Sequence, residues 1–464
     1  MVVFRLNEGF ETPSLAQWEE AAKKALNASD LSPLTAQTED GLAIAPLYIP
    51  SNKSTPSFVP DNRDFILRPR IDLPDIDAAR RQAQDEIDNG SNGLLITLAG
   101  ATAQPFGIAL QNERDVARFL ESLPIERISL RLEPGDDLKL AGAFMRAGFK
   151  GVHPGFDLIG RAAWRGEFPE LKKDFAAALA FIEEHERQRA GFIADARLYH
   201  NAGASDIQEL GLALATAAEN LRQMDALGIR TDKIRQSLLL AVDAQQFLSI
   251  IKLRAMRLLW ARFSEAVAGA PQPVHLSAET SARMLSAKDP ATNLIRNTLA
   301  AFAAIIGGAE KITVLPHTSA LGLPDAFARR LARNTLLLLR EEAHVAQVAD
   351  AARGSAFVED MTLRLAQAAW AFFQQVEKDG GIYAALQAGT VQRLIAQKRE
   401  ARKKTYTENK KLLVGVTAFP DAKPQAVNVL AQLPRDKNIP KLALRTARDA
   451  ETFETQAKHT GAAA

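Results

Sequence analysis

The sequence predicts an α/β fold: a (β/α)8 TIM barrel with an N-terminal extension and a helical C-terminal segment. Two observations predict it. Short apolar runs alternate with longer helical patterns from about residue 64 to 320, and the runs are continuously apolar, as strands covered on both faces require. No glycine fingerprint follows the first strand, so a closed barrel is favoured over an open doubly wound sheet, which stays the alternative.

Residues 1–62 are expected to form an N-terminal extension that acts as an arm for subunit contact. The stretch SLAQWEEAAKKALNA predicts a short amphipathic helix, because its apolar residues recur at helical spacing. A turn at EDG and the Pro- and Ser-rich stretch APLYIPSNKSTPSFVPDN follow. Such a composition is unsuited to a core of its own.

The barrel domain is expected over residues 63–411, with its strands and helices in alternation. Six strands are predicted, at 93–101, 126–132, 151–160, 190–199, 273–280 and 311–319. Four helices between them are predicted at 75–90, 175–190, 207–228 and 293–309. Two further strands are expected in less regular stretches, and FLSII at 247–251 is strand-like.

The domain should end in a helical segment over residues 324–405. Its first two helices are joined by REEAHVAQVADAARGSAFVEDMT, residues 340–362, which contains Asp350 and the turn pair Gly354-Ser355. The charged residues of this stretch could carry carboxylate chemistry, but the composition favours a hinge between two helices. Residues 412–464 are expected to be a linker or tail.

Composition excludes several classes of protein. The formal charge of +2 comes from 57 basic and 55 acidic residues that are interspersed, so no grip on nucleic acid is expected. No apolar run approaches the roughly 20 residues that cross a bilayer, and the start lacks a signal-peptide pattern, so a cytoplasmic protein is expected. With no cysteine, disulfides and thiolate chemistry are excluded.

The remaining polar groups do not predict a metal site, and two sets of them can be interpreted either as ligand contacts or as structural contacts. No two of the seven histidines have the spacing of a metal site on one helix, so no metal is expected. Arg254 lies beside other cations in IIKLRAMRLLWARF and could bind a phosphorylated ligand or form surface salt bridges. Thr97, Ser129 and Ser277 lie on predicted strands. Their hydroxyl groups either indicate a polar interior that admits a narrow ligand or form hydrogen bonds to the backbone.

The helical segment carries the most specific sequence. The string RNTLLLLREEAHVAQVADAARGSAFVEDMTLRLAQAAWAFFQQVEKDGG resembles the signature region of the methylmalonyl-CoA mutases, and KLRAMRLLWA, ETSARMLSAKDPATNLIRNT and LLVGVTAF also match. The resemblance implies a barrel threaded by the pantetheine arm of coenzyme A. It also implies a radical interconversion of succinyl-CoA and methylmalonyl-CoA, with adenosylcobalamin held between the barrel and a separate C-terminal domain.

The sequence departs from the active members at their chemical positions. Arg70 stands where they carry the Tyr of Thr-Ile-Arg-Gln-Tyr, and Leu198 where they carry a His that bonds the thioester carbonyl. Glu279 replaces a Gln and Ser319 an Asn. A Tyr-His pair does occur, at Tyr199 and His200, but two places later than the family's pair. On a strand, a shift of two residues would return these side chains to the same face. The cobalamin domain's Asp-x-His-x-x-Gly motif does not occur, so no such domain is expected here.

These departures resemble the small, non-catalytic subunit type. The resemblance implies a heterodimer with a larger catalytic mutase chain, with adenosylcobalamin present in the complex and not bound by a motif of this chain. The alternatives are an active barrel that borrows a separately encoded cobalamin-binding subunit and a stand-alone acyl-CoA-binding barrel. No catalytic residue is expected, and Arg68, Arg254 and His317 are the candidates for contact with an acyl-CoA.

Overall fold

The chain forms two compact units. The computed structural model describes residues 13–49, 64–135, 137–147, 152–183, 192–229, 236–423, 426–434 and 438–456. The contacts divide the chain into Met1–Lys53 and Ser54–Ala464. Within the described residues, no helix combines the length and the apolar content that a bilayer crossing requires.

The first unit contains one helix and a small hairpin. Helix α1 (Leu15–Leu26) begins with a capping box in which Ser14 and Gln17 bond each other's backbone N–H groups. A 3-10 turn, η1 (Ser32–Leu34), leads to β1 (Ala36–Gln37), which pairs antiparallel with β2 (Ala43–Ile44). No residue of α1 is buried, so its apolar side chains have no core in this structure.

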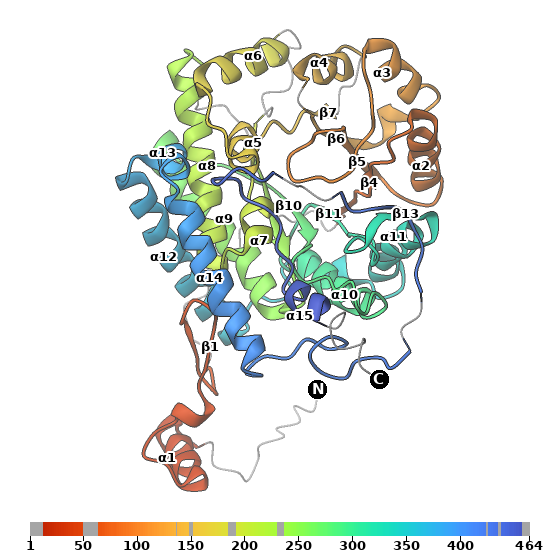
Figure 1. Cartoon of the computed structure of the whole chain (residues 1–464). Helices are drawn as coiled ribbons and strands as arrows, with labels where there is room; N and C mark the ends of the chain where they lie inside the picture. The colour runs from red at the N-terminus through yellow and green to blue at the C-terminus, as the bar shows by residue number, and fades with distance from the viewer. Residues whose placement is uncertain are drawn as a thin grey trace, which may run out of the picture. The chain divides into compact units, whose positions relative to one another are not determined.

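The second unit is built on short parallel strands. In chain order they are β3 (Ile66–Leu67), β4 (Arg70–Ile71), β5 (Gly93–Thr97), β6 (Ser129–Glu133), β7 (Val152–His153), β8 (Ile193–Asp195), β9 (Ser237–Val242), β10 (His275–Thr280) and β11 (Lys311–Thr313). They pair in the orders β4-β5-β6-β7 and β3-β11-β10-β9-β8, with every pair parallel (Figure 1). The predicted α/β class is confirmed.

The two sheets continue into one another. Strands β3 and β4 belong to one extended segment, in which Arg68 N–H donates to Ile312 on one side and Pro69 C=O accepts from Leu95 on the other. At the opposite join, Phe156 beyond β7 bridges Phe192 before β8 in parallel. The pairing therefore passes through eight strand positions and returns to the first, which is the order of a (β/α)8 barrel. We call this arrangement the barrel.

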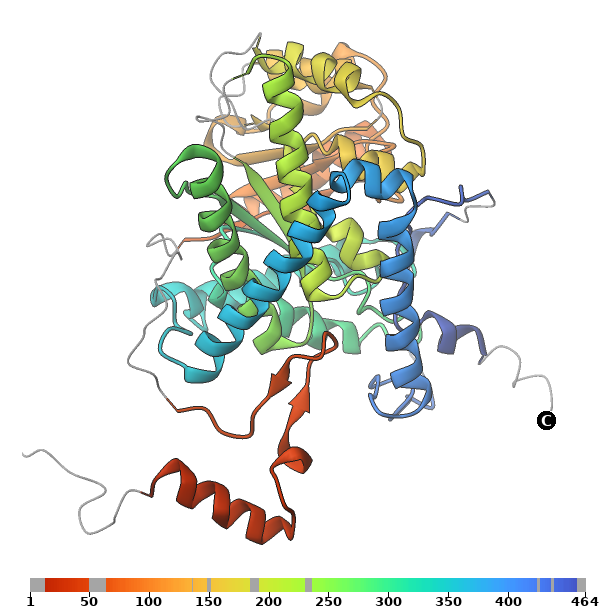
Figure 2. The same cartoon turned by 90° about the vertical axis from the view of Figure 1, so that its left-hand side faces the viewer.

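Helices surround the strands. They are α2 (Ile76–Asp88), α3 (Glu113–Leu120), α4 (Leu138–Arg146), α5 (Leu158–Arg165), α6 (Leu171–Glu183), α7 (Arg197–Ala202), α8 (Asp206–Ala226), α9 (Gln246–Ala268) and α10 (Thr292–Ile306). The helical segment adds α11 (Ala326–Glu341), α12 (Ala356–Lys378), α13 (Gly381–Gln387) and α14 (Thr390–Thr407). Helix α12 packs across α8 and α9 (Figure 2).

Parts of three strand predictions are α-helical in the structure. Residues 158–160 of the predicted strand 151–160 begin α5. FLSII at 247–251 lies inside α9, and the strand before it is β9, SLLLAV. Residues 197–199 belong to the short helix α7, because the chain turns directly after β8. A short apolar run fits a buried strand and a buried helix equally well, so periodicity could not separate them.

The stretch 340–362 joins two helices, as the hinge interpretation expects. It contains the end of α11, a 3-10 turn η4 (Val345–Gln347) and the first residues of α12. Asp350 and Gly354 have left-handed backbone, with φ of 48° and 84°, and Ser355 is the N-cap residue of α12. Arg254 of α9 pairs with Asp350 and, at 2.9 Å, with Glu359. The acidic groups of this stretch thus hold helices together.

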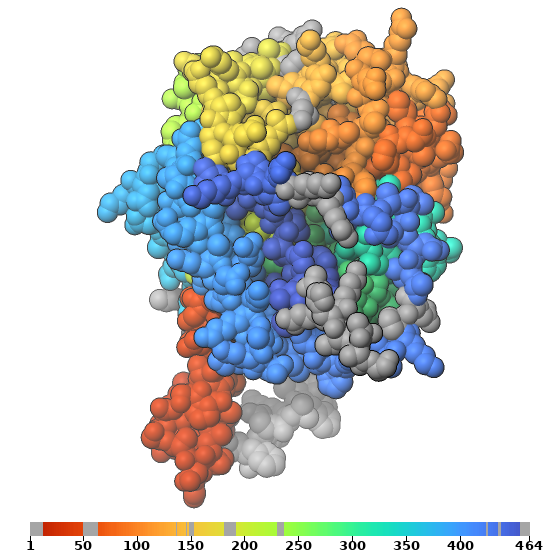
Figure 3. All heavy atoms as spheres, viewed as in Figure 1, coloured from red at the N-terminus to blue at the C-terminus, as the bar shows by residue number. Residues whose placement is uncertain are grey.

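The tail is more than a linker. Strand β13 (Val429–Gln432) pairs antiparallel with β12 (Gly322–Pro324), where a side chain on Gly322 would meet Ala431 O at 2.0 Å. Farther on, three backbone N–H groups of the tail donate to backbone carbonyls of the barrel. Leu444 donates to Ala163, Ala447 to Asn201 and Asp449 to Arg283. The tail ends in the short helix α15 (Glu451–Gln456). It therefore crosses the segments that follow several barrel strands (Figure 3).

Candidate functional site

A cavity of about 700 Å³ opens at the carboxyl ends of the barrel strands, the end at which barrel enzymes carry their sites. Arg70, Leu198, Glu279 and Ser319, the four positions singled out in the sequence, all line it. Trp164, the loop 102–106 and tail residues 433, 434, 439, 445, 446, 448 and 451 complete much of its wall. Residues far apart in sequence are thus brought to one place.

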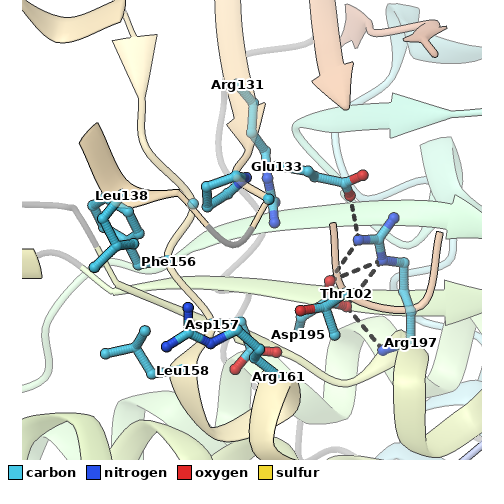
Figure 4. A pocket seen from close by; sticks show the side chains of 13 residues that line it. Thr102, Arg131, Glu133, Leu138, Phe156, Asp157, Leu158, Arg161, Asp195 and Arg197 are labelled. Atoms are coloured by element: carbon cyan, nitrogen blue, oxygen red, sulfur yellow. Dashed lines mark hydrogen bonds and ion pairs between the residues drawn. The ribbon is translucent and has the colours of Figure 1, made fainter. Parts of the chain in front are cut away.

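Two of the four replaced positions, Arg70 and Glu279, pair with each other. Glu279 Oε2 accepts from Arg70 Nη2 at 2.5 Å and from Arg197 Nη1 at 2.6 Å. Arg197 also bonds Asp195 and Glu133 (Figure 4). The four side chains of Arg70, Arg197, Glu133 and Glu279 are between 5% and 11% exposed, so solvent screens their charges little.

These contacts fix the charges of the cluster. Burial by itself would raise the pKa of Glu133, but the charges of Arg197 and Arg70 lower it to about 2. Burial opposes the charge of Arg197 too, yet Asp195 and Glu279 raise the pKa of its guanidinium well above its usual value. Glu133 therefore has no proton to give near neutral pH, and its charge is already matched by arginine. This arrangement suits structure better than acid–base catalysis.

Helix α7 sets the direction of the side chains beyond Leu198. The expectation that Tyr199 and His200 return to the strand face is wrong, because two residues span about 200° on a helix. Tyr199 Oη lies 3.2 Å from Thr216 Oγ1. His200 is fully buried, with Nδ1 2.9 Å from Glu209 Oε2 and Nε2 2.8 Å from Ser281 Oγ.

The surroundings of His200 include the one group of side chains, among the described residues, with metal-binding geometry. His200, Asp206 and Glu209 bring ligand atoms within 4.8 Å of one another. Lys252 already supplies a cation there, with Nζ 2.7 Å from Glu209 Oε2 and 3.0 Å from Asp206 Oδ1. An ammonium between the carboxylates favours a structural ion pair over a metal site.

The three proposed acyl-CoA contacts lie in different places, and none of them lines the cavity. Arg68 is buried in the barrel, where Nη2 donates to Ser277 Oγ at 2.9 Å. Arg254 is engaged by α12 and the turn before it. His317 follows β11 and is 6% exposed, with Nδ1 unpartnered and a pKa lowered by burial. Their role in ligand binding stays a prediction.

Sequence reasoning missed Glu133 and Asp195. Both stand at the carboxyl ends of otherwise apolar strands, β6 and β8, and that position was the available signal. Arg197 directly precedes Leu198 and was not singled out in the sequence. Its importance arises because α7 starts there and directs its guanidinium to three carboxylates.

A buried carboxyl beside this cluster makes stability depend on pH. Asp157 Oδ1 caps α5 by accepting from Gly160 N–H at 2.9 Å, while Oδ2 is buried without a partner. Burial and then the charge of Asp195 raise the pKa of Asp157 to about 8. The neutral form is thus favoured by folding, and the stability that it contributes below about pH 4 is lost as the pH rises through 8.

Asp157→Asn should become more stable than the wild type as the pH rises from 5 to 8, because the amide keeps the cap without a buried charge. The gain is at most ~1.4 kcal/mol per pH unit. Urea unfolding of both proteins at several pH values measures it. Asp137→Asn, at the exposed N-cap of α4, should show a constant difference. A constant difference for Asp157→Asn as well would contradict the prediction.

Known proteins resemble the chain over most of its length. The sequence model of the family described as Methylmalonyl-CoA mutase matches residues 156–464. A methylmalonyl-CoA mutase small subunit of Streptomyces virginiae is 36% identical over 83% of this chain and 66% of its own length. The small subunit of Propionibacterium freudenreichii subsp. shermanii is 32% identical over 94% of this chain and 73% of its own length. A methylmalonyl-CoA mutase of Rhizobium meliloti is 26% identical over 96% of this chain and 68% of its own length. The chain thus spans about two thirds of the length of these relatives.

Proposed function

The chain belongs to the methylmalonyl-CoA mutase family, and from that premise we propose that it is a non-catalytic barrel subunit supporting a larger mutase chain. Two relatives that carry the name small subunit support the assignment to this type. The complex would interconvert succinyl-CoA and methylmalonyl-CoA in the cytoplasm, and the chemistry would take place on the larger chain.

The observation that carries the proposal is the pairing of Arg70 and Arg197 with Glu279. A catalytic cavity needs groups that are free to bind substrate and to change their interactions during the reaction. Here the side chains at two of the replaced positions satisfy each other. A substrate polar group would have to break a buried ion pair before it could be bound, and that cost is several kcal/mol.

The described lining of the cavity does not fit cobalamin. It contains no histidine, and the buried His200 nearby has both ring nitrogens engaged. Tail residues also form part of the wall. Adenosylcobalamin would therefore belong to the larger chain of the complex, and no step is assigned to it here.

The first unit is the proposed arm for the partner chain. Helix α1 is amphipathic in sequence, and none of its residues is buried. Leu15 is 44% exposed, which leaves an apolar side chain available for contact with another surface. A heterodimer in which this arm contacts the larger chain would give these side chains a partner.

Co-expression with the larger chain from the same genome tests the proposal. We expect a one-to-one complex on size-exclusion chromatography, turnover by the complex, and none by this chain with adenosylcobalamin alone. Replacement of the radical-guiding tyrosine in the larger chain's Thr-Ile-Arg-Gln-Tyr motif should abolish all turnover. Turnover that persists in that complex, or the absence of a complex, would contradict the proposal.

The size of the cavity favours one alternative, a barrel that binds an acyl-CoA by itself. A volume of about 700 Å³ is in the range of small-molecule sites. Titration calorimetry of the isolated chain with succinyl-CoA and with coenzyme A distinguishes this alternative from the proposed supporting subunit. Binding without turnover would support the alternative, and turnover on addition of a separate cobalamin-binding protein would support an active barrel.

A further inference from the structure

A second charged level lies deeper in the barrel than the ion pairs. In register, Arg131 of β6 stands beside His153 of β7, and Lys311 of β11 beside Ser277 of β10. Neighbours in register on parallel strands point to the same side of the sheet. Arg68 bonds Ser277 across the interior, since β11 separates their strands. We call Arg68, Arg131 and Lys311, together with the uncharged His153, the cationic layer.

Among the described residues, no carboxylate forms an ion pair with the cationic layer, although Glu133, Glu279, Asp195 and Glu310 lie close enough to act on its charges. Arg68, Arg131 and Lys311 are 2%, 3% and 9% exposed. In the part of the chain that the structure describes, the side chains of Arg131 and Lys311 form neither a hydrogen bond nor an ion pair, and Nδ1 of His153 is buried without a partner. Buried cations in this state are costly unless an anion compensates them.

The carboxylates around the layer are already engaged, and Glu310, which adjoins Lys311, bonds His275 and Arg257. Glu133 and Glu279 lie two residues beyond Arg131 and Ser277 on their strands. Both bond Arg197, and Glu279 also bonds Arg70. Burial and the charge of Arg68 lower the pKa of Lys311 to about 8. Burial and then Lys311 lower the pKa of His153 to about 3. These directions show that the groups of the layer repel one another.

We propose that the cationic layer binds one small oxyanion with the size and charge of inorganic phosphate, reached from the amino-terminal ends of the strands. At that end the side chains of His275 and Glu310 are 35% and 25% exposed. Toward the other end Arg131 lines a cavity of about 30 Å³ with Glu133, Asp195 and Arg197. The site does not depend on the proposed function.

Calorimetric titration of the full chain with inorganic phosphate, at constant ionic strength set with chloride, tests this site. Removing one charge-assisted contact by Lys311→Met should raise the phosphate Kd roughly 10- to 100-fold. Lys172→Met, at an exposed position on α6, is the matched control and should leave the Kd unchanged. Because the Lys311 side chain bonds no partner among the described residues, Lys311→Met should fold and have a Tm at or above that of the wild type in phosphate-free buffer.

Three results would overturn the site: no phosphate binding by the wild type, an unchanged Kd in Lys311→Met, or equal losses in both lysine variants. If Lys311→Met fails to fold, Arg131→Met takes its place in the same titration. Coenzyme A, which also carries phosphate, is the second arm. Phosphate binding that persists in the presence of coenzyme A supports a free small oxyanion, and displacement by coenzyme A would overturn that assignment.

Discussion

Arg197→Met should lower the free energy of unfolding by about 3–5 kcal/mol, the usual cost of removing one partner from a buried charge cluster. Arg197 is 4% exposed and bonds Glu133, Asp195 and Glu279. Without it these carboxylates stay buried with less positive charge nearby. Urea unfolding of the purified chain at neutral pH measures the loss.

Arg262→Met is the matched control for Arg197→Met. Arg262 pairs with Glu265 at 3.1 Å on the surface of α9, with side chains 68% and 49% exposed. Exposed pairs contribute little, so a change within about 0.5 kcal/mol is expected. Equal effects of the two substitutions would show that the cluster in the cavity is hydrated and not a buried network.

Lys252→Met should also cost about 3–5 kcal/mol, because it leaves carboxylates without their cation. Lys252 is 1% exposed, and its partners are Glu209 and Asp206. Burial raises the pKa of Glu209 even in the wild type, although Lys252 opposes that shift. Without the lysine the pKa should rise further, so the loss should be larger at pH 8 than at pH 5. Unfolding at both pH values measures it.

Lys404→Met provides the control for Lys252→Met. Its Nζ lies 3.6 Å from Glu408 on α14, and the lysine side chain is 74% exposed. A loss within about 0.5 kcal/mol and without pH dependence is expected. A small and pH-independent effect of Lys252→Met would mean that Glu209 has another cation, such as a metal ion held with His200 and Asp206, and would revive the metal interpretation.

Much of the fold could be predicted because its signals are local. Helix α8 was predicted almost to its bounds, since its apolar residues and the Ser205–Gln208 capping box lie within a few turns. The assignment to the methylmalonyl-CoA mutases, made from the strings in the helical segment, is confirmed by the family match. β9 was missed, and the first turn of α9 was interpreted as strand-like, because apolar runs at 237–242 and 247–251 fit strand and helix alike.

The candidate site was predicted in part. Comparison with the family's motifs identified Arg70, Leu198, Glu279 and Ser319 as one group, and the structure places all four on one cavity. It could not show that Glu279 would accept from two arginines, one of them 209 positions away. Nor could it show that Tyr199 and His200 face away from the strand, because that depends on the chain turning into α7.

The sequence by itself determined the family, the α/β class and which reactive side chains are missing, because residue identity and local periodicity carry that information. Only the tertiary structure decided what the replacements do: Arg70 and Glu279 pair with each other, the tail adds a wall to the cavity, and buried cations without ion pairs among the described residues gather below. The physical reason is that a charge's effect depends on burial and on the charges within a few ångströms. Those neighbours come from strands far apart in the chain, and only the closing of the barrel brings them together.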